Sequence, residues 1–205
     1  KLLSLSAGTT VFEREVVEIA ETARKVSVIT HQEHYEAEQL IVCGGLQADR
    51  LAKIAGLQSD CTIVPFRGDF YLLADAFKTK FKHLIYPVPD PALPFLGVHI
   101  TSHIDGNVSV GPSAMLAFAR EAYTKFGFNL TDTFETLANR GFWRLMVRYP
   151  KASVKELSMA LSLQRYAQAA QKYCPAISAR DFKQHRCGIR AQAVDAKGVL
   201  IHDFL

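Results

Sequence analysis

Residues 96–104 alternate between hydrophobic and polar positions, which is the pattern of a β-strand with one buried and one polar face. The Asp-Gly pair at 105–106 then predicts a hairpin turn. A three-residue loop that starts at this pair would place Ile104 opposite Val108, so that the apolar side chains of both strands share one face. The polar face of this predicted hairpin carries His99.

Similar patterns elsewhere predict the other elements. Residues 62–73 form a strand-like run, in which Pro65 and Gly68 predict a bend or bulge. Ser153 and Glu156 have the spacing of a capping box, which predicts that a helix starts there and runs to about residue 173. Further strands are predicted at 10–19, 25–30, 35–43, 187–194 and 199–204, and further helices at 46–55, 131–139 and 141–146.

Strand-like runs on both flanks of a long helical block predict an α+β fold. We expect a mixed or antiparallel sheet that includes the hairpins at 96–110 and 187–204. The helices between residues 131 and 173 are expected to pack on one side or one end of that sheet.

The composition is that of an ordinary globular protein, because 49% of the 205 residues are hydrophobic and 21% are charged. A chain of this size buries about 70% of its unfolded surface, which is enough for a real core. The net charge is +4, and the lysines and arginines are scattered, so the sequence offers no basic stripe for nucleic acid. A weak preference for anionic ligands is all that this charge implies.

The four cysteines have neither the spacing of a zinc site nor the density of a disulfide scaffold. They predict reduced thiols and a cytoplasmic location. His31 and His34 lie in a predicted turn with no carboxylate or cysteine cluster beside them, so no metal site is predicted. No window approaches the roughly 20 apolar residues that are needed to span a bilayer.

Gly44 and Gly45 follow the apolar run 40–43, which predicts a short buried strand, and precede a helix that ends at Gly56. A strand, two glycines and a helix start can direct backbone N–H groups toward an anion. Small residues also allow a helix to pack closely against a strand. The local sequence is compatible with both interpretations of the glycine pair, anion binding and close packing.

Two arginines lie in strand-like runs with apolar neighbours. Arg67 could pair with a neighbouring carboxylate such as Asp69, or could direct its guanidinium at the carboxylate of a substrate. Arg190 needs a partner if it is buried. Both alternatives, a structural ion pair and an anion-binding role, remain open from the residues alone.

Several short motifs resemble one enzyme family in combination and in order. They are Gly-Leu-Gln-Ala-Asp-Arg at 45–50, Pro-Phe-Arg-Gly at 65–68, Tyr-Pro-Val-Pro-Asp-Pro at 86–91, Pro-Phe-Leu-Gly-Val-His at 94–99 and Gly-Ile-Arg-Ala-Gln-Ala at 188–193. Residues 40–205 resemble the L-2-hydroxyglutarate oxidases and dehydrogenases, which are FAD-dependent enzymes of the glycine-oxidase and D-amino-acid-oxidase class. The resemblance implies FAD as cofactor and oxidation of a 2-hydroxy acid by hydride transfer to the flavin.

None of the twelve glycines forms the Gly-x-Gly-x-x-Gly fingerprint with which this family opens. We therefore expect a fragment, or one chain of a split enzyme, that is inactive without the missing dinucleotide-binding segment. The resemblance implies three parts. Residues 1–56 would be the remainder of the FAD-binding domain, 57–186 the substrate-binding domain, and 187–205 a return hairpin towards the FAD-binding domain.

The resemblance also implies roles for individual residues. Oxidising a five-carbon hydroxy diacid needs a base for the hydroxyl proton and cationic anchors for two carboxylates. His99 is the candidate base, and Arg67, Tyr71 and Arg190 are the candidate substrate ligands, with both arginines pointing into one pocket. The candidate FAD contacts are Gly44, Gly45, Leu46, Gly188 and Arg190.

One alternative belongs to another functional class. The chain could be a non-catalytic module that binds a small anion or a partner and owns no cofactor, as the missing fingerprint would suggest. For the enzyme, a peripheral contact with the inner membrane, or with a quinone or another electron acceptor, is compatible with the sequence.

Overall fold

The computed structural model describes residues 8–89, 96–121, 123–124 and 127–201. The chain divides into two compact units, Lys1–Ser59 and Asp60–Leu205. The four cysteines are all unpaired thiols. Within the described part of the chain, no helix is both long and apolar enough to cross a membrane.

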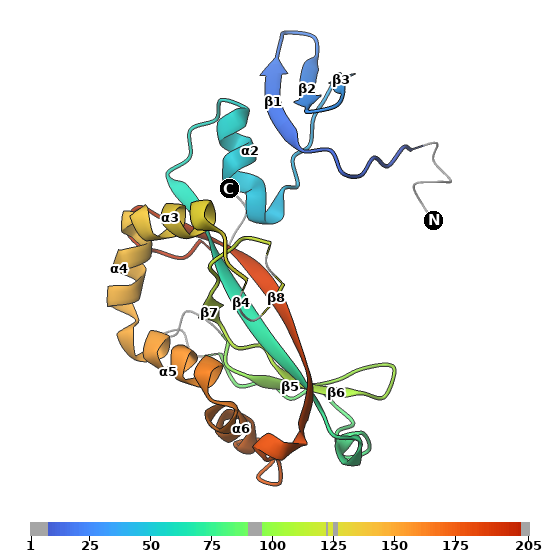
Figure 1. The fold of residues 1–205 in the computed structure, drawn as a ribbon, viewed down its shortest axis with the longest axis vertical. Coiled ribbons are helices and arrows are strands. Elements are labelled where there is room, and N and C mark those ends of the chain that lie inside the picture. The colour runs from blue at the N-terminus through green and yellow to red at the C-terminus, as the bar shows by residue number, and fades with distance from the viewer. Residues whose placement is uncertain (1–7, 90–95, 122, 125–126, 202–205) are drawn as a thin grey trace. The chain divides into compact units, whose positions relative to one another are not determined.

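The first unit contains a three-stranded antiparallel sheet and a short helix (Figure 1). Its strands are β1 (Val16–Glu21), β2 (Val26–Thr30) and β3 (His34–Ala37), with β2 in the centre. A 3₁₀ turn at Gly45–Gln47 leads into α2 (Ala48–Ile54). Gly56 follows with φ of +77°, which confirms the predicted glycine stop, because this left-handed conformation favours glycine.

The predicted buried strand at residues 40–43 is wrong. These residues have no regular secondary structure, and Ile41 is 84% exposed. The strand β3 ends at Ala37, and among the described residues no strand pairs with the segment that follows it. An apolar run becomes a strand only where a neighbour accepts its backbone hydrogen bonds.

The second unit is built on two long antiparallel strands, β4 (Cys61–Leu73) and β8 (Phe182–Asp195), which lie side by side in Figure 1. The other edge of β4 pairs with β6 (Val108–Gly111) and with the short β7 (Met115–Leu116), and β5 (His99–Ser102) extends the sheet beyond β6. Residues 187–195, predicted to return towards the FAD-binding domain, are part of this sheet. The end of the predicted last strand, at 202–204, lies outside the described residues.

Four consecutive helices follow the sheet from one end to the other (Figure 1). They are α3 (Leu130–Ala138), α4 (Arg140–Arg148), α5 (Pro150–Leu161) and α6 (Leu163–Gln171). Ser162 separates the last two, and its side chain accepts a hydrogen bond from the Arg165 N–H, as expected of a helix N-cap. Strands followed by a helical layer confirm the predicted α+β fold.

Two hydrophobic clusters hold the helices against the sheet. In one, Phe142 and Leu145 of α4 pack against Val64, Phe66 and Val194 of the long strands. In the other, α6 packs against the β5–β6 hairpin and the end of β4; its fully buried members include Ile100, Val108, Val110, Tyr166 and Ala170.

The hairpin buries the predicted face, but its pairing differs from the prediction. Val110 lies opposite Ile100, and the turn is closed by a hydrogen bond from the His103 N–H to the Asn107 carbonyl oxygen (2.8 Å). The loop is therefore residues 104–106, with Gly106 at φ of +78°, and Ile104 is fully exposed rather than paired. A shift of two residues keeps the paired side chains on their predicted faces, so the apolar face is correct except for Ile104, which now lies in the loop.

Two other local predictions are wrong. The ladder between β4 and β8 continues through Pro65 and Gly68, and its irregularity lies between Tyr71 and Leu73 instead. The helix predicted from the capping box begins earlier, at Pro150, where the fixed φ of proline suits the first helical position. The Ser153 hydroxyl donates to the Tyr149 carbonyl oxygen (3.0 Å) rather than capping the helix.

Candidate substrate-binding site

The β4–β8 ladder brings two motifs together that lie far apart in the sequence. Phe66 lies directly opposite Arg190, Arg67 opposite Ile189, and Gly68 opposite Gly188. The Pro-Phe-Arg-Gly and Gly-Ile-Arg-Ala-Gln-Ala segments are therefore cross-strand neighbours. Their pairing creates the centre of the candidate site.

The same register separates the two arginines. Directly opposite residues of an antiparallel pair share a face, and consecutive residues alternate between faces. Arg190 therefore lies on the face of Phe66, and Arg67 lies on the other face with Ile189. The hypothesis that both arginines point into one pocket is not supported by this arrangement.

Arg67 is buried in an ion pair with Asp69. The two residues are 4% and 1% exposed, and two hydrogen bonds join them, from Nε to Oδ1 (2.9 Å) and from Nη2 to Oδ2 (3.2 Å). They are two positions apart on β4, so they share a face. This geometry matches the structural alternative raised for Arg67, because a planar two-pronged bond to a carboxylate occupies the fork of the guanidinium.

On the other face, a pocket with a volume of about 230 Å³ lies over the paired glycines. The exposed side chain of Arg190 lines it. A Cβ on Gly68 would lie 2.6 Å from Pro112 Cβ, whereas a Cβ on Gly188 would meet no atom within 4 Å. Gly68 therefore allows the wall of the pocket to approach β4, and Gly188 keeps its floor open. The remaining lining residues are Phe66, Phe70, Leu96, Pro112, Ser113, Ala114 and Ile189.

Three hydrogen bonds hold the wall at residues 112–114, two with the backbone of Asp69 and one with the side chain of Glu156. The Asp69 N–H donates to Ser113 Oγ (3.1 Å), and the Ser113 N–H donates to the Asp69 carbonyl oxygen (3.2 Å). The Ala114 N–H donates to Oε2 of Glu156 on α5 (2.7 Å). Sequence reasoning missed this wall, since a preceding Gly-Pro pair and a helix-like composition gave no clear pattern.

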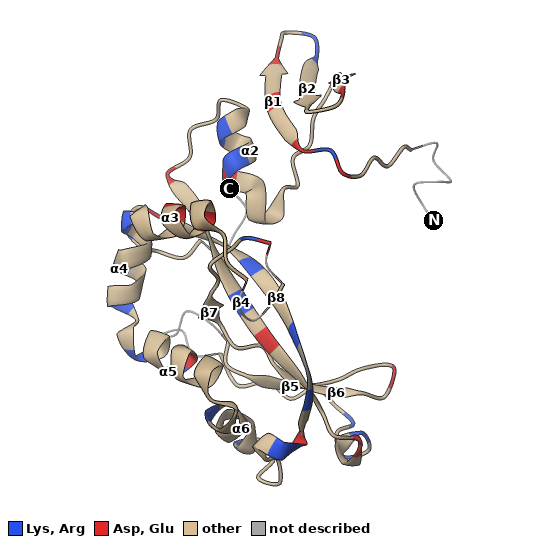
Figure 2. Ribbon diagram, in the orientation of Figure 1, with Lys and Arg blue, Asp and Glu red and all other residues tan. Residues whose placement is uncertain are grey.

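The strand β8 carries basic residues along its length, which appear as blue segments in Figure 2. Arg186 lies opposite Phe70, which lines the pocket, and it is exposed like Arg190. Positions 186, 188 and 190 alternate with the strand period, so the two arginines share one face and flank Gly188. Sequence reasoning missed Arg186, because only the pairing with Phe70 reveals its place beside the pocket.

His99 lies on β5 opposite Gly111, one residue before the pocket wall begins. Its ring stacks on Tyr86 with the centroids 4.3 Å apart. Nδ1 is buried and has no hydrogen-bond partner in the described part of the structure. Burial lowers the pKa of His99, which favours the neutral imidazole at pH 7. His99 is not one of the pocket-lining residues.

Tyr71 lies away from the pocket, in the aromatic part of the core. Its ring centroid is 5.0 Å from that of Tyr166 and 5.4 Å from that of Phe182. Burial raises the pKa of the Tyr71 hydroxyl. Of the four residues predicted to bind or transform the substrate, only Arg190 lines the pocket.

The glycines predicted to contact FAD fall into two kinds. A Cβ on Gly44 would lie 2.5 Å from Leu51 Cδ1, so the end of this α2 side chain would have to move to admit it, and the half-buried Leu46 follows in the same turn. Gly45 has φ of +51° and, like Gly188, would present an added Cβ to open space. The open space beside Gly45, and beside Gly188 in the other unit, would allow a ligand to approach the backbone closely at each place.

Comparison with known proteins agrees with these motifs. The chain is 44% identical over 206 residues to L-2-hydroxyglutarate dehydrogenase of Escherichia coli (strain K12), covering 100% of this chain and 49% of the relative. It is 39% identical over 176 residues to the mitochondrial L-2-hydroxyglutarate dehydrogenase of Homo sapiens, covering 86% of this chain and 38% of the relative. The chain thus spans about half the length, or less, of the curated relatives it matches.

Two solved structures share the fold. The L-alpha-glycerophosphate oxidase of Mycoplasma pneumoniae, solved with FAD bound, superposes with a TM-score of 0.59 at 17% identity over 88% of this chain and 39% of that one. Glycine oxidase of Bacillus cereus superposes with a TM-score of 0.56 at 15% identity over 93% of this chain and 41% of that one. Residues 3–203 match the family model described as "DAO: FAD dependent oxidoreductase". The chain therefore belongs to the DAO family of FAD dependent oxidoreductases.

Proposed function

We propose that this chain supplies the substrate-binding part of an enzyme that oxidises L-2-hydroxyglutarate to 2-oxoglutarate with FAD as cofactor. The proposal is supported by family membership, by the names of its relatives and by the pocket over Gly68 and Gly188. The observation that carries it is the exposed arginine face of β8. A small dicarboxylate needs cationic anchors that water and substrate can reach, and the buried Arg67 does not offer one.

Arg190 and Arg186 are the two anchors in this proposal. They are four residues apart on one strand, which separates their Cα atoms by about 13 Å. Two arginine side chains that reach inwards over Gly188 can close this gap onto the two carboxylates of a five-carbon diacid. Each guanidinium offers a planar fork of donors that matches a carboxylate.

His99 remains the candidate base for the hydroxyl proton, but it does not line this pocket, so the substrate would have to reach its ring from the wall beside Gly111. Burial lowers the pKa of His99, which favours the neutral imidazole that a general base requires. When bound, FAD supplies the acceptor for the α-hydrogen and its electron pair. The arginines would hold and orient the two carboxylates of the substrate, and the space beside Gly188, where an added Cβ would meet no atom within 4 Å, would leave room for the cofactor.

The test is anaerobic addition of L-2-hydroxyglutarate to the complete, flavin-loaded enzyme. We expect the visible flavin absorbance to bleach while one 2-oxoglutarate forms for each flavin reduced. The D-enantiomer is the matched control and should leave the absorbance unchanged. If neither enantiomer bleaches the flavin, or if the protein holds no flavin, the chain is better explained as a non-catalytic anion-binding module.

A further inference from the structure

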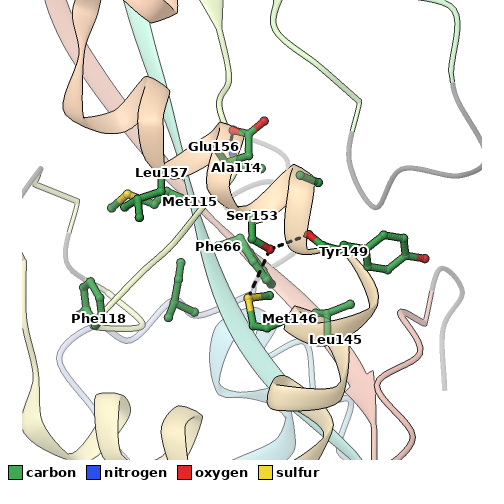
Figure 3. A pocket seen from close by; sticks show the side chains of 12 residues that line it. Phe66, Ala114, Met115, Phe118, Leu145, Met146, Tyr149, Ser153, Glu156 and Leu157 are labelled. Carbon is green, nitrogen blue, oxygen red and sulfur yellow. Dashed lines mark hydrogen bonds between the residues drawn. The ribbon is translucent and has the colours of Figure 1, made fainter.

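A second pocket lies in the Asp60–Leu205 unit between the sheet and the helices α4 and α5 (Figure 3). Its volume is about 260 Å³. Phe66 of β4 and Met115 of β7 line it from the sheet, and Leu145 and Met146 of α4 line it from the helices. The other lining residues are Ala114, Leu116, Phe118, Tyr149, Ala152, Ser153, Glu156 and Leu157.

Two polar side chains of this pocket, those of Ser153 and Glu156, are engaged with the protein itself. The Ser153 hydroxyl donates to the Tyr149 carbonyl oxygen and also contacts Met146 Sδ at 3.6 Å, as the dashed lines in Figure 3 show. Oε2 of Glu156 accepts the Ala114 N–H. Burial also raises the pKa of Glu156, which shifts this carboxyl towards its neutral form. A ligand here would therefore be held by apolar contact rather than by charge.

The size and chemistry of the lining indicate which apolar molecule fits. An engineered apolar cavity of about 150 Å³ stays dry and binds benzene. The pocket beside α5 is larger, which leaves room for a second ring. Phe66 and Phe118 contribute aromatic rings to the lining and Met115 and Met146 contribute thioethers, while Phe118 and Leu157, 41% and 50% exposed, mark its side open to solvent. Aromatic pairs and sulfur–aromatic contacts both favour a ring over an aliphatic chain.

We propose that this pocket is a binding site for a neutral aromatic molecule of one or two fused rings. The site is separate from the pocket that holds Arg190, but two residues, Phe66 and Ala114, line both. A ring bound beside α5 therefore contacts the wall of the proposed substrate pocket. The inference does not depend on the proposed oxidation, because it rests on this cavity alone.

The three methionines provide a direct test. Met115 and Met146 line the pocket. Met159 is instead buried in the hydrophobic cluster that contains Tyr166 and Ala170 of α6. The chain is labelled with [¹³C-methyl]methionine, the three signals are assigned by single Met→Leu substitutions, and naphthalene is titrated in. We expect saturable shifts of the Met115 and Met146 signals and an unchanged Met159 signal. If Met115 and Met146 do not shift, or if all three methyls shift together without saturation, the proposal is wrong.

Substitutions that fill the pocket should weaken the binding of naphthalene. Ala152→Leu adds three carbons to a lining residue on α5, whereas Ala138→Leu makes the same change at an exposed position of α3 and serves as the control. We expect naphthalene to bind the control with unchanged affinity and the filled variant at least tenfold more weakly. Ser153→Leu is a second filling variant, used if circular dichroism shows that Ala152→Leu does not fold. Unchanged affinity in a folded filling variant would place the ligand elsewhere and overturn the proposal.

Discussion

The two faces of the β4–β8 ladder use arginine in opposite ways. On one face, Arg67 is nearly inaccessible and is joined to Asp69 by two hydrogen bonds. On the other, Arg186 and Arg190 are exposed and flank Gly188 beside a pocket. Arg67 and Arg190 both lie in family-like motifs with apolar neighbours, so the residues around them in the sequence do not distinguish their roles. The difference shows that strand register, rather than residue type, decides which arginine can meet a ligand.

The largest expected effect concerns the buried face. Replacing Arg67 with methionine leaves Asp69 charged and buried without its two guanidinium donors, and breaking a buried pair in this way costs about 3–5 kcal/mol. We expect urea unfolding of the Asp60–Leu205 unit to show a loss of this size. The double variant Arg67→Met with Asp69→Leu should recover much of it, because both charges are then absent. A single variant that loses less than about 1 kcal/mol would contradict a structural role for the pair.

Gly68 and Gly188, which pair across the two strands, allow a further test on the face that carries Arg190. Gly68→Ala should destabilise the fold by about 1–3 kcal/mol, because the new methyl group overlaps Pro112 Cβ. Gly188→Ala should change stability by no more than about 0.5 kcal/mol, since its methyl group enters open space. The same methyl group stands between Arg186 and Arg190, so kcat/KM of the complete enzyme should still fall. Thermal unfolding and steady-state kinetics separate the two effects, and equal stability losses at both glycines would count against this account.

How much of this arrangement the sequence predicts depends on the range of the interactions. Alternation over residues 96–104 predicts a buried face that includes Ile100, because that choice is local. The pairing of Phe66 with Arg190 joins strands more than one hundred residues apart, and no local pattern determines it. The hydrogen bonds of Tyr166 also join residues that lie far apart in the sequence. Its hydroxyl donates to the carbonyl oxygens of Asp69 (2.6 Å) and Val110 (3.2 Å), which ties α6 to two strands.

The smallest expected effect concerns Glu156, which holds the wall shared by the two pockets. Burial raises the pKa of Glu156 in the folded protein, so the protonated form folds more favourably than the ionised form. Stability from this group is therefore present below its unfolded pKa and is lost as the pH rises through the folded value. Glu156→Gln cannot ionise but keeps an oxygen for the Ala114 N–H. We expect the variant to gain stability relative to the parent between acidic and neutral pH, and to lose this advantage in acid. A stability difference that does not change with pH would contradict the buried setting of this carboxyl.

The central claim is that substrate recognition belongs to the Arg190 face and not to the Arg67 face. The most direct measurement is kcat/KM for L-2-hydroxyglutarate in the complete, flavin-loaded enzyme carrying Arg190→Lys, which keeps the charge but loses the planar fork. A charge-assisted hydrogen bond contributes roughly 1.5–3 kcal/mol, so we expect kcat/KM to fall about ten- to a hundredfold, with the urea midpoint unchanged. An Arg190→Lys enzyme that keeps the parent's kcat/KM would contradict the claim.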